Sequence, residues 1–366
     1  MSGFVTIGDI CDILNGYAFK SNKYVDAGIR VIRITNVQKG FIEDADPQYY
    51  PVSEQKEIEK YMLQEGDLLM SLTGNVGRVA LLGADMLPAA LNQRVACLRI
   101  KESAIIYKPF LFHLLNSDYF ESKCILSSKG VAQKNMSTEW LKDYSIPLFP
   151  MEQQIEIASI FDKINAIIAS RKEQVQNLDQ LVKSRFIELF RDKYQTMTLE
   201  NVCEELFAGG DVKKDRLSDI KTDEYPYPIY TNGEKNNGLY GYTNIIRVKK
   251  EAVTISGRGT IGFTCLRKEA FYPAVRLIVA VPNQQFVSGC YLKYFIESKN
   301  YGGQGASIPQ LTVPMIKDEL IPVPPIELQE QFAAFVEQVD KSKLAIQKSL
   351  EKLEILKKSL MQKYFG

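Results

Sequence analysis

The sequence predicts an α/β (α+β) protein built from two similar domains with irregular, β-rich loops. We expect the domains to be separated by two long antiparallel coiled-coil helices and related by a pseudo-two-fold internal repeat. Residues 130–190 align without a gap on residues 305–365, and both copies end in a heptad pattern. Each copy also follows a segment rich in strand and turn signals. A solenoid unit has roughly 20–50 residues, so this longer repeat indicates a duplicated half.

These patterns place the domain boundaries along the chain. We predict domains at 1–146 and 195–321, a central long helix at 147–194 and a C-terminal long helix at 322–366. The 366 residues are sufficient for two separate hydrophobic cores. The N-terminus has no basic flank of a signal peptide, and the six cysteines form no CxxC pair. We therefore expect a cytoplasmic protein with reduced, packed cysteines.

The two domains share an order of strands, turns and helices. In the first, a strand at 66–73, a glycine turn at 74–77 and a returning strand at 78–82 are expected. The second repeats this order at 252–256, 257–262 and 263–266. A further apolar strand and a helical stretch follow in each domain, at 94–100 and 109–123 and at 276–281 and 288–298.

Each long helix is expected to begin after a proline-rich entry, because proline is tolerated in the first helical turn. Glu152 and Glu327 lie near these N-termini, where the helix dipole favours an acid. Apolar residues then recur at three- and four-residue steps, which is typical of a coiled coil. Two separate amphipathic helices remain the alternative. The heptad positions are Phe161, Ile164, Ile168, Val175, Leu178, Val182 and Leu189, and Val336, Val339, Ile346, Leu350, Leu353 and Leu360.

Several enzyme classes have little support in this sequence. His113 is the single histidine and lies in an apolar helical run, so we expect a packed residue rather than a general base. The sequence contains no P-loop, no GxSxG elbow and no cysteine or histidine cluster that would indicate a metal site. Residues 46–49 (DPQY) resemble the base-gripping loop of adenine methyltransferases, with Gln48 in place of a proline. A self-sufficient methyltransferase or nuclease that uses this region is therefore the alternative hypothesis.

Polar loops carry the side chains that base readout requires. Arginine can contact guanine O6 and N7, and asparagine or glutamine can contact adenine N6 and N7. The tyrosine- and asparagine-rich segment 224–242 can contact DNA or can be a simple hairpin, and both interpretations stay open. The net charge is only +1, so bulk positive charge does not hold this chain on DNA. The candidate DNA-binding residues are Asn75, Arg78, Asn92, Gln93, Arg94, Lys129, Gln133, Lys134, Asn135, Tyr230, Asn232, Asn236, Arg258, Thr260, Arg276, Gln304, Ser307 and Gln310.

The chain resembles the specificity subunit of type I restriction–modification enzymes. The matching features are the duplicated order of domain then helix and the repeated helix entry at 146–154 (IPLFPMEQQ) and 321–329 (IPVPPIELQ). The turns at 71–77 (SLTGNVG) and 255–262 (ISGRGTIG) match as well. The resemblance extends over nearly the whole chain.

This resemblance implies a protein that catalyses no reaction itself. Each target recognition domain would read one half of a bipartite site in double-stranded DNA, and the helices would set the spacer. The helices would also dock two modification subunits that methylate adenine, and two restriction subunits can join them. No cofactor would be bound by this chain, whereas the partner subunits would use S-adenosylmethionine, ATP and Mg²⁺. A coiled-coil scaffold with no DNA role is a third hypothesis.

Overall fold

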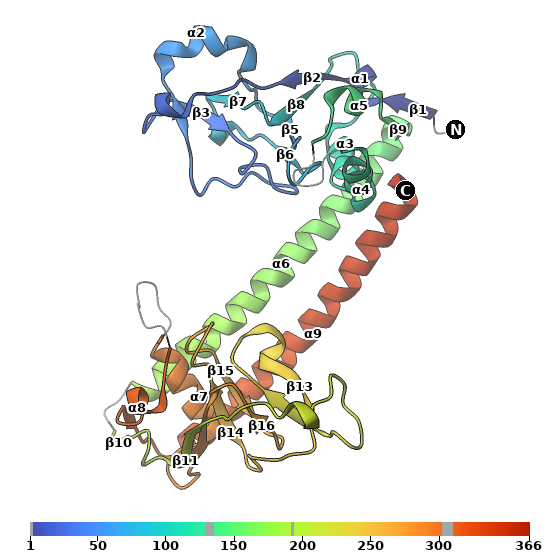
Figure 1. Ribbon diagram of the computed structural model, residues 1–366. Coiled ribbons are helices and arrows are strands. Elements are labelled where there is room, and N and C mark those ends of the chain that lie inside the picture. The colour runs from blue at the N-terminus through green and yellow to red at the C-terminus, as the bar shows by residue number, and fades with distance from the viewer. Residues whose placement is uncertain (1–2, 129–134, 192–193, 302–309) are drawn as a thin grey trace. The chain divides into compact units, whose positions relative to one another are not determined.

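The computed structural model describes residues 3–128, 135–191, 194–301 and 310–366. The chain divides into two compact units. Unit 1 comprises residues 1–172 and 348–366, and unit 2 comprises residues 173–347. Each unit contains one α/β domain together with parts of both long helices (Figure 1).

The described residues of unit 1 form three small sheets. The four-stranded sheet has the order β2-β8-β5-β6, the three-stranded sheet has the order β4-β3-β7, and β1 pairs with β9. The strands are β1 (Gly3–Thr6), β2 (Cys11–Asn15), β3 (Ile29–Ile32), β4 (Tyr49–Tyr50), β5 (Leu68–Ser71), β6 (Val79–Leu81), β7 (Ala89–Leu91), β8 (Val95–Ile100) and β9 (Ser145–Leu148). The α-helices are α1 (Ile7–Ile10), α2 (Gln55–Ile58), α3 (Lys108–Leu115), α4 (Asp118–Ser127) and α5 (Thr138–Asp143).

Unit 2 repeats this topology strand for strand. Its sheets have the orders β11-β17-β14-β15, β13-β12-β16 and β10-β18. The strands are β10 (Thr196–Thr198), β11 (Cys203–Ala208), β12 (Tyr227–Tyr230), β13 (Leu239–Thr243), β14 (Ala252–Ile255), β15 (Thr264–Arg267), β16 (Tyr272–Pro273), β17 (Ile278–Pro282) and β18 (Leu320–Pro322). The helices are α7 (Gly289–Ser298) and α8 (Val313–Ile316). In both units one pair of the three-stranded sheet is parallel, β3 with β7 and β12 with β16, so the predicted duplication is confirmed.

The predicted strands form the buried centre of each unit. All four residues of β5 and of β14 are buried, so both faces of these antiparallel strands are covered. The helical stretch predicted at 109–123 is instead two helices, α3 and α4. The chain breaks there because the Ser117 hydroxyl accepts the Phe120 N–H at 3.1 Å and caps a new helix.

The long helices are α6 (Met151–Phe190) and α9 (Ile326–Phe365). A fully buried glutamine fixes the start of each. Gln154 accepts the Tyr107 N–H at 2.8 Å and donates to the carbonyls of Phe149 and Ile105 at 2.8 and 3.2 Å. Gln329 accepts the Ser288 N–H at 2.8 Å and donates to the carbonyls of Phe286 and Pro324 at 2.9 Å. The repeated glutamine of the helix entry therefore attaches each helix to its own domain.

The two helices pack against each other within each unit. In unit 1 the beginning of α6 contacts the end of α9, and the Phe161 and Phe365 rings stack with centroids 5.4 Å apart. In unit 2 the end of α6 contacts the beginning of α9, and the Phe186 and Phe332 rings meet edge to face at 5.4 Å. The helices therefore pair in opposite directions in both units, which confirms the predicted antiparallel pairing.

Two further expectations concern individual residues. His113 is 2% exposed and its Nε2 lies 2.7 Å from Asp162 Oδ1 on α6, so its predicted packed role is confirmed. The six cysteines are free, and Cys11, Cys97 and Cys124 are buried. Among the described residues, no helix has the length and apolar composition that crossing a membrane requires.

Candidate nucleic-acid interface

A glycine turn between β5 and β6 forms the first element of the candidate site in unit 1. The Ser71 carbonyl accepts the Gly77 N–H at 2.9 Å, and the Ser71 N–H donates to the Arg78 carbonyl at 3.0 Å. Gly74 and Gly77 have φ values of 68° and 81°, a region that glycine enters without strain. The turn therefore exposes the side chain of Asn75 on a fixed backbone, whereas the Thr73 hydroxyl is buried and has no hydrogen-bond partner among the described residues.

The turn between β14 and β15 has the same construction in unit 2. The Ser256 carbonyl accepts the Gly262 N–H at 2.9 Å, and the Ser256 N–H donates to the Phe263 carbonyl at 2.8 Å. Gly259 and Gly262 have φ values of 68° and 82°. Arg258 and Thr260 thus occupy the positions that Thr73 and Asn75 occupy in unit 1.

The start of the central strand is the second element. The Val95 N–H donates to the Asn92 carbonyl at 2.9 Å, and the Leu277 N–H donates to the Ala274 carbonyl at 3.1 Å. Parallel bridges join Tyr17 to Asn92 and Gly210 to Ala274 in the same way. By this register Arg94 and Arg276 are equivalent residues, and both are exposed.

A third segment, far away in the sequence, completes each site. The Met136 N–H donates to the Leu72 carbonyl at 2.9 Å, and the Leu311 N–H donates to the Gly257 carbonyl at 2.8 Å. These bonds place Asn135 beside Thr73 and Gln310 beside Arg258. We call the three segments of unit 1 frame 1 (71–78, 92–95, 135–136). The three equivalent segments of unit 2 are frame 2 (256–263, 274–277, 310–311).

Frame 1 lines one part of a cavity of about 290 Å³. Of the predicted residues, Asn75, Arg78 and Arg94 line it. Asn92 lies next to them and accepts the Arg94 N–H at 3.2 Å, while Gln93 and Asn135 are exposed nearby. Lys129, Gln133 and Lys134 lie outside the described residues.

Frame 2 lines one part of a cavity of about 220 Å³, and the predicted residues on that lining are Arg258, Arg276 and Gln310. Arg258 donates from Nε and Nη2 to Gln310 Oε1 at 3.1 and 2.8 Å. Thr260 lines a different, larger cavity of about 760 Å³ beside α7. Gln304 and Ser307 lie outside the described residues.

The structure assigns internal contacts to two predicted residues of unit 2. Tyr230 is 8% exposed, and its hydroxyl donates to Glu269 Oε1 at 2.7 Å. Burial, with the Glu269 hydrogen bond, raises the pKa of Tyr230 to about 12. Asn232 accepts the Gly257 N–H at 2.7 Å and donates to the Val275 carbonyl at 2.5 Å. In this structure both residues support frame 2 from within, whereas Asn236 is exposed.

The segment 224–242 folds as a hairpin of β12 and β13. Its turn contains Asn236 and Asn237, with φ values of 51° and 52°. These left-handed conformations suit asparagine better than most residues. Of the two interpretations left open by the sequence, the hairpin is confirmed, and it leaves both asparagine side chains exposed for contact.

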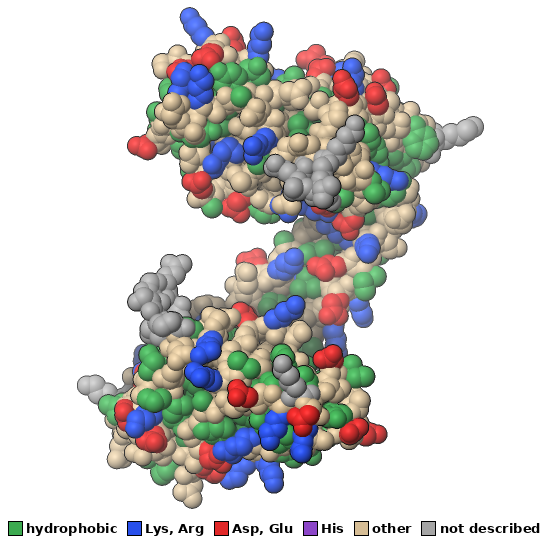
Figure 2. Space-filling view, in the orientation of Figure 1, with side chains coloured by type: hydrophobic (Ala, Val, Ile, Leu, Met, Phe, Trp, Pro, Cys, Tyr) green, Lys and Arg blue, Asp and Glu red, His purple; other side chains and the backbone are tan. Residues whose placement is uncertain are grey.

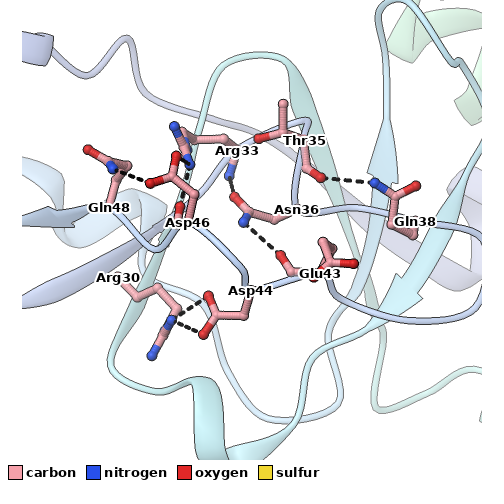
Figure 3. A network of polar contacts seen from close by, with 9 residues as sticks. All are labelled: Arg30, Arg33, Thr35, Asn36, Gln38, Glu43, Asp44, Asp46 and Gln48. Atoms are coloured by element: carbon pink, nitrogen blue, oxygen red, sulfur yellow. Dashed lines mark hydrogen bonds and ion pairs between the residues drawn. The ribbon is translucent and has the colours of Figure 1, made fainter. Parts of the chain in front are cut away.

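Sequence reasoning missed the connection between β3 and β4, which forms one wall of the frame 1 cavity. Thr35 and Gln38 line that cavity, and Gln38 Oε1 accepts a hydrogen bond from Arg78 Nη1. Figure 3 shows the network that holds this connection, in which Arg30 pairs with Asp44 and Asn36 bonds the Arg33 N–H and the Glu43 carbonyl. No periodic pattern marks such a loop, so only its fold could reveal these residues.

The same network accounts for residues 46–49, on which the enzyme alternative depended. Asp46 pairs with Arg33 at 3.0 Å and accepts from Gln48 Nε2 at 3.2 Å (Figure 3). The hydrogen bond from Arg33 holds the pKa of Asp46 below its usual value. Within the described ranges, no group of three or more His, Cys, Asp and Glu side chains is arranged to hold a metal ion. These polar side chains therefore have a structural explanation.

Charge on the face shown in Figure 2 is mixed, with Lys and Arg interspersed among Asp and Glu. This distribution agrees with the net charge of +1. Recognition by the frames would therefore depend on hydrogen bonds from a few arginine and amide groups.

Comparisons with known proteins agree with this interpretation. The family model described as "Type I restriction modification DNA specificity domain" matches residues 2–180 and 191–357. The EcoBI specificity subunit of Escherichia coli is 23% identical, and the alignment covers 99% of this chain and 85% of that protein. The protein S.MpnORF507P of Mycoplasma pneumoniae is 25% identical over 64% of this chain, which spans 65% of that relative's length.

A solved structure of a type I restriction–modification system, from a study of its complex assembly and conformational transition, has the same fold. Its TM-score is 0.63 at 17% identity, and the alignment covers 100% of this chain and 97% of that one. The two segments that the family model matches together cover most of the chain. This assignment contradicts the enzyme alternative. The chain belongs to the family of type I restriction–modification DNA specificity subunits, which are the non-catalytic components of these enzymes.

Proposed function

We propose that this chain reads a bipartite DNA site, one half with each unit. It thereby determines which adenines the partner subunits methylate. The observation that carries this proposal is the pair of matched frames. The glycine turns of frames 1 and 2 have φ values that agree within a degree, whereas the side chains that they present differ. Equivalent backbones with unlike side chains would read two unlike half-sites.

The differences between the frames have direct consequences for base choice. Thr73, Asn75 and Asn135 in frame 1 correspond to Arg258, Thr260 and Gln310 in frame 2. Arginine favours guanine and amides favour adenine in the major groove. Frame 2 would therefore contact a guanine through Arg258, with Gln310 orienting the guanidinium. Arg94 and Arg276, the equivalent pair, would make a similar contact in both halves.

The paired helices would hold the two readers at a fixed separation. A helix of 40 residues, such as α6 or α9, is about 60 Å long. We infer that this length sets the spacer between half-sites and that the outer helix faces dock two modification subunits. Those subunits would bind S-adenosylmethionine and flip the adenine for methylation. Two restriction subunits that use ATP and Mg²⁺ can join them, while this chain would bind no cofactor.

A domain exchange tests this function. Residues 196–320 are replaced by the matching segment of another family member, and the chain is co-expressed with its modification subunits. Single-molecule sequencing of methylated adenines should show one half of the site changed and the other half and the spacer kept. If both halves change together, or if methylated sites are the same without this chain, the proposal is wrong.

A further inference from the structure

A buried arginine in unit 2 invites a functional explanation. Arg267 is the last residue of β15 and is 7% exposed. Moving a guanidinium out of water is costly unless hydrogen bonds and ring contacts replace the lost hydration. The contacts that replace this hydration at Arg267 therefore need to be identified.

Arg267 has three distinct partners. Its Nε donates to Thr254 Oγ1 at 3.1 Å, and its Nη2 donates to the Asn237 carbonyl at 2.5 Å. The guanidinium carbon also lies 3.6 Å from the centroid of the Tyr230 ring, a favourable cation–π arrangement. We call Tyr230, Thr254 and Arg267 the polar trio.

In unit 1 the three equivalent positions hold apolar residues. Counting from the equivalent serines of the two frames, Leu69 corresponds to Thr254 and Leu82 corresponds to Arg267. Ile32 corresponds to Tyr230, because their carbonyls accept from the equivalent residues Asn92 and Ala274. These three residues, Ile32, Leu69 and Leu82, are buried in one apolar cluster. The fold thus accepts an apolar trio here, so the polar trio is not needed to form the sheet.

Two hydrogen bonds link the polar trio to segments beyond its own strands. The Tyr230 hydroxyl donates to Glu269 Oε1 at 2.7 Å, and Arg267 reaches the turn of the β12–β13 hairpin. Asn236, Asn237 and Gly238 have φ values of 51°, 52° and 77°, so three successive residues are left-handed. Such a turn is strained and needs fixed contacts to persist. The bond from Arg267 to the Asn237 carbonyl supplies one.

The same turn is joined to frame 2 at its base. The Gly233 N–H donates to Ser256 Oγ at 3.1 Å, and Asn232 bridges Gly257 and Val275. The exposed side chains of Asn236 and Asn237 therefore lie on an element that frame 2 and Arg267 hold from two directions. Two adjacent exposed amides on a rigid turn suit the hydrogen-bonding edge of adenine.

We propose that the polar trio is a positioning device that sets Asn236 and Asn237 against an adenine in the half-site read by unit 2. The proposal rests on the proposed function and deepens it. Tyr230, Thr254 and Arg267 contact no base; Asn236 and Asn237 do. At the equivalent positions unit 1 has apolar residues, and the Arg30–Asp44 and Arg33–Asp46 pairs hold its β3–β4 connection.

The test replaces the polar trio by the residues of unit 1, as Tyr230→Ile, Thr254→Leu and Arg267→Leu in one chain. The variant is assembled with its modification subunits, and methylated adenines are mapped by single-molecule sequencing. We expect one or two positions of the second half-site to accept other bases. At these positions the ratio of methylation at the preferred base to methylation at another base should fall by about 10- to 100-fold. Asn236→Ala with Asn237→Ala should relax the same positions. The first half-site and the spacer should stay as in the native enzyme.

A second variant leaves the side chains of the polar trio unchanged. Gly238→Ala places a Cβ 2.5 Å from the Thr231 carbonyl oxygen and strains the turn directly. Gly238→Ala should weaken the base preference at the same positions of the half-site. Arg267→Lys should keep more of that base preference than Arg267→Leu does. A folded trio variant and a folded Gly238→Ala variant that both keep full base preference would overturn the proposal. If the native enzyme itself methylates no bipartite site, the proposed function fails instead.

Discussion

Gln154 Oε1 accepts the Tyr107 N–H at 2.8 Å, and Gln329 makes the same bond to Ser288 at the same distance. Both side chains are fully buried, and each amide group also serves two carbonyls. Three backbone groups in each unit thus depend on one glutamine where a long helix meets its domain.

Replacing either glutamine by leucine should therefore destabilise its unit. The change leaves one N–H and two carbonyls without their glutamine partner, at a cost of about 1–3 kcal/mol where such a group is shielded from water. We expect Gln154→Leu and Gln329→Leu each to lower the free energy of unfolding by about 2–4 kcal/mol. Urea denaturation followed by circular dichroism measures it. Gln153→Leu, on an exposed neighbour, is the control and should change stability little.

The equivalent glycines of the two turns should tolerate alanine poorly for a conformational reason alone. Gly74 and Gly259 both have φ of 68°, and a Cβ on either would meet no atom within 4 Å. The left-handed region costs an L-residue about 1–2 kcal/mol, so each alanine should destabilise its unit by about that amount. Thermal unfolding provides the measurement. Gly3→Ala, which also has free space but no left-handed φ, should be neutral; an equal loss there would refute this reasoning.

His113 should make stability fall in mild acid. Burial lowers its pKa below 6.5, although the Asp162 hydrogen bond opposes this effect. The unfolded chain therefore binds a proton before the folded chain does as the pH falls. This contribution to stability is complete above about pH 6.5 and is lost progressively below it, as the pH approaches the lowered pKa.

Unfolding free energies measured between pH 5 and pH 8 check this expectation. His113→Phe removes the titrating group and should flatten the slope below pH 6.5 relative to the native chain. Asp162→Asn should steepen the native slope, because it removes the group that raises the pKa of His113. An unchanged slope in His113→Phe would assign the pH dependence to other groups.

The helices should act together in setting the spacer. Asp179 and Lys343 form an ion pair between α6 and α9 at 2.5 Å, which gives the register of the two helices in unit 2. One heptad inserted after Asp179 and one before Lys343 would keep that register and lengthen the pair by about 10 Å. We expect the accepted spacer to grow by about three base pairs or methylation to be lost. Methylated-adenine mapping reports either result.

A heptad inserted in α6 alone is the control for this experiment. It breaks the register of the paired helices, so it should lower thermal stability as well as activity. If the double insertion yields an active enzyme with an unchanged spacer, the helices do not determine the spacing between half-sites.

Much of the architecture follows from local patterns that can be recognised in a single sequence. The glycine turns at 74–77 and 257–262, the buried runs of β5 and β14, and the heptads of α6 and α9 each record a backbone requirement over a few residues. The gapless repeat adds that the two halves share one topology. Backbone geometry of this kind depends on near neighbours, so the sequence alone determined it.

The roles of individual side chains depended on tertiary structure. Tyr230 and Asn232 resemble surface readers in sequence, yet the fold turns both inward to support frame 2. No sequence pattern marked Gln38 as a site residue, yet it accepts a hydrogen bond from Arg78. Arg267 donates to the Asn237 carbonyl, 30 positions earlier in the chain. These contacts join segments that no local pattern connects. Their free energy depends on burial and on partners that only the packed chain brings together, which is why tertiary structure decided them.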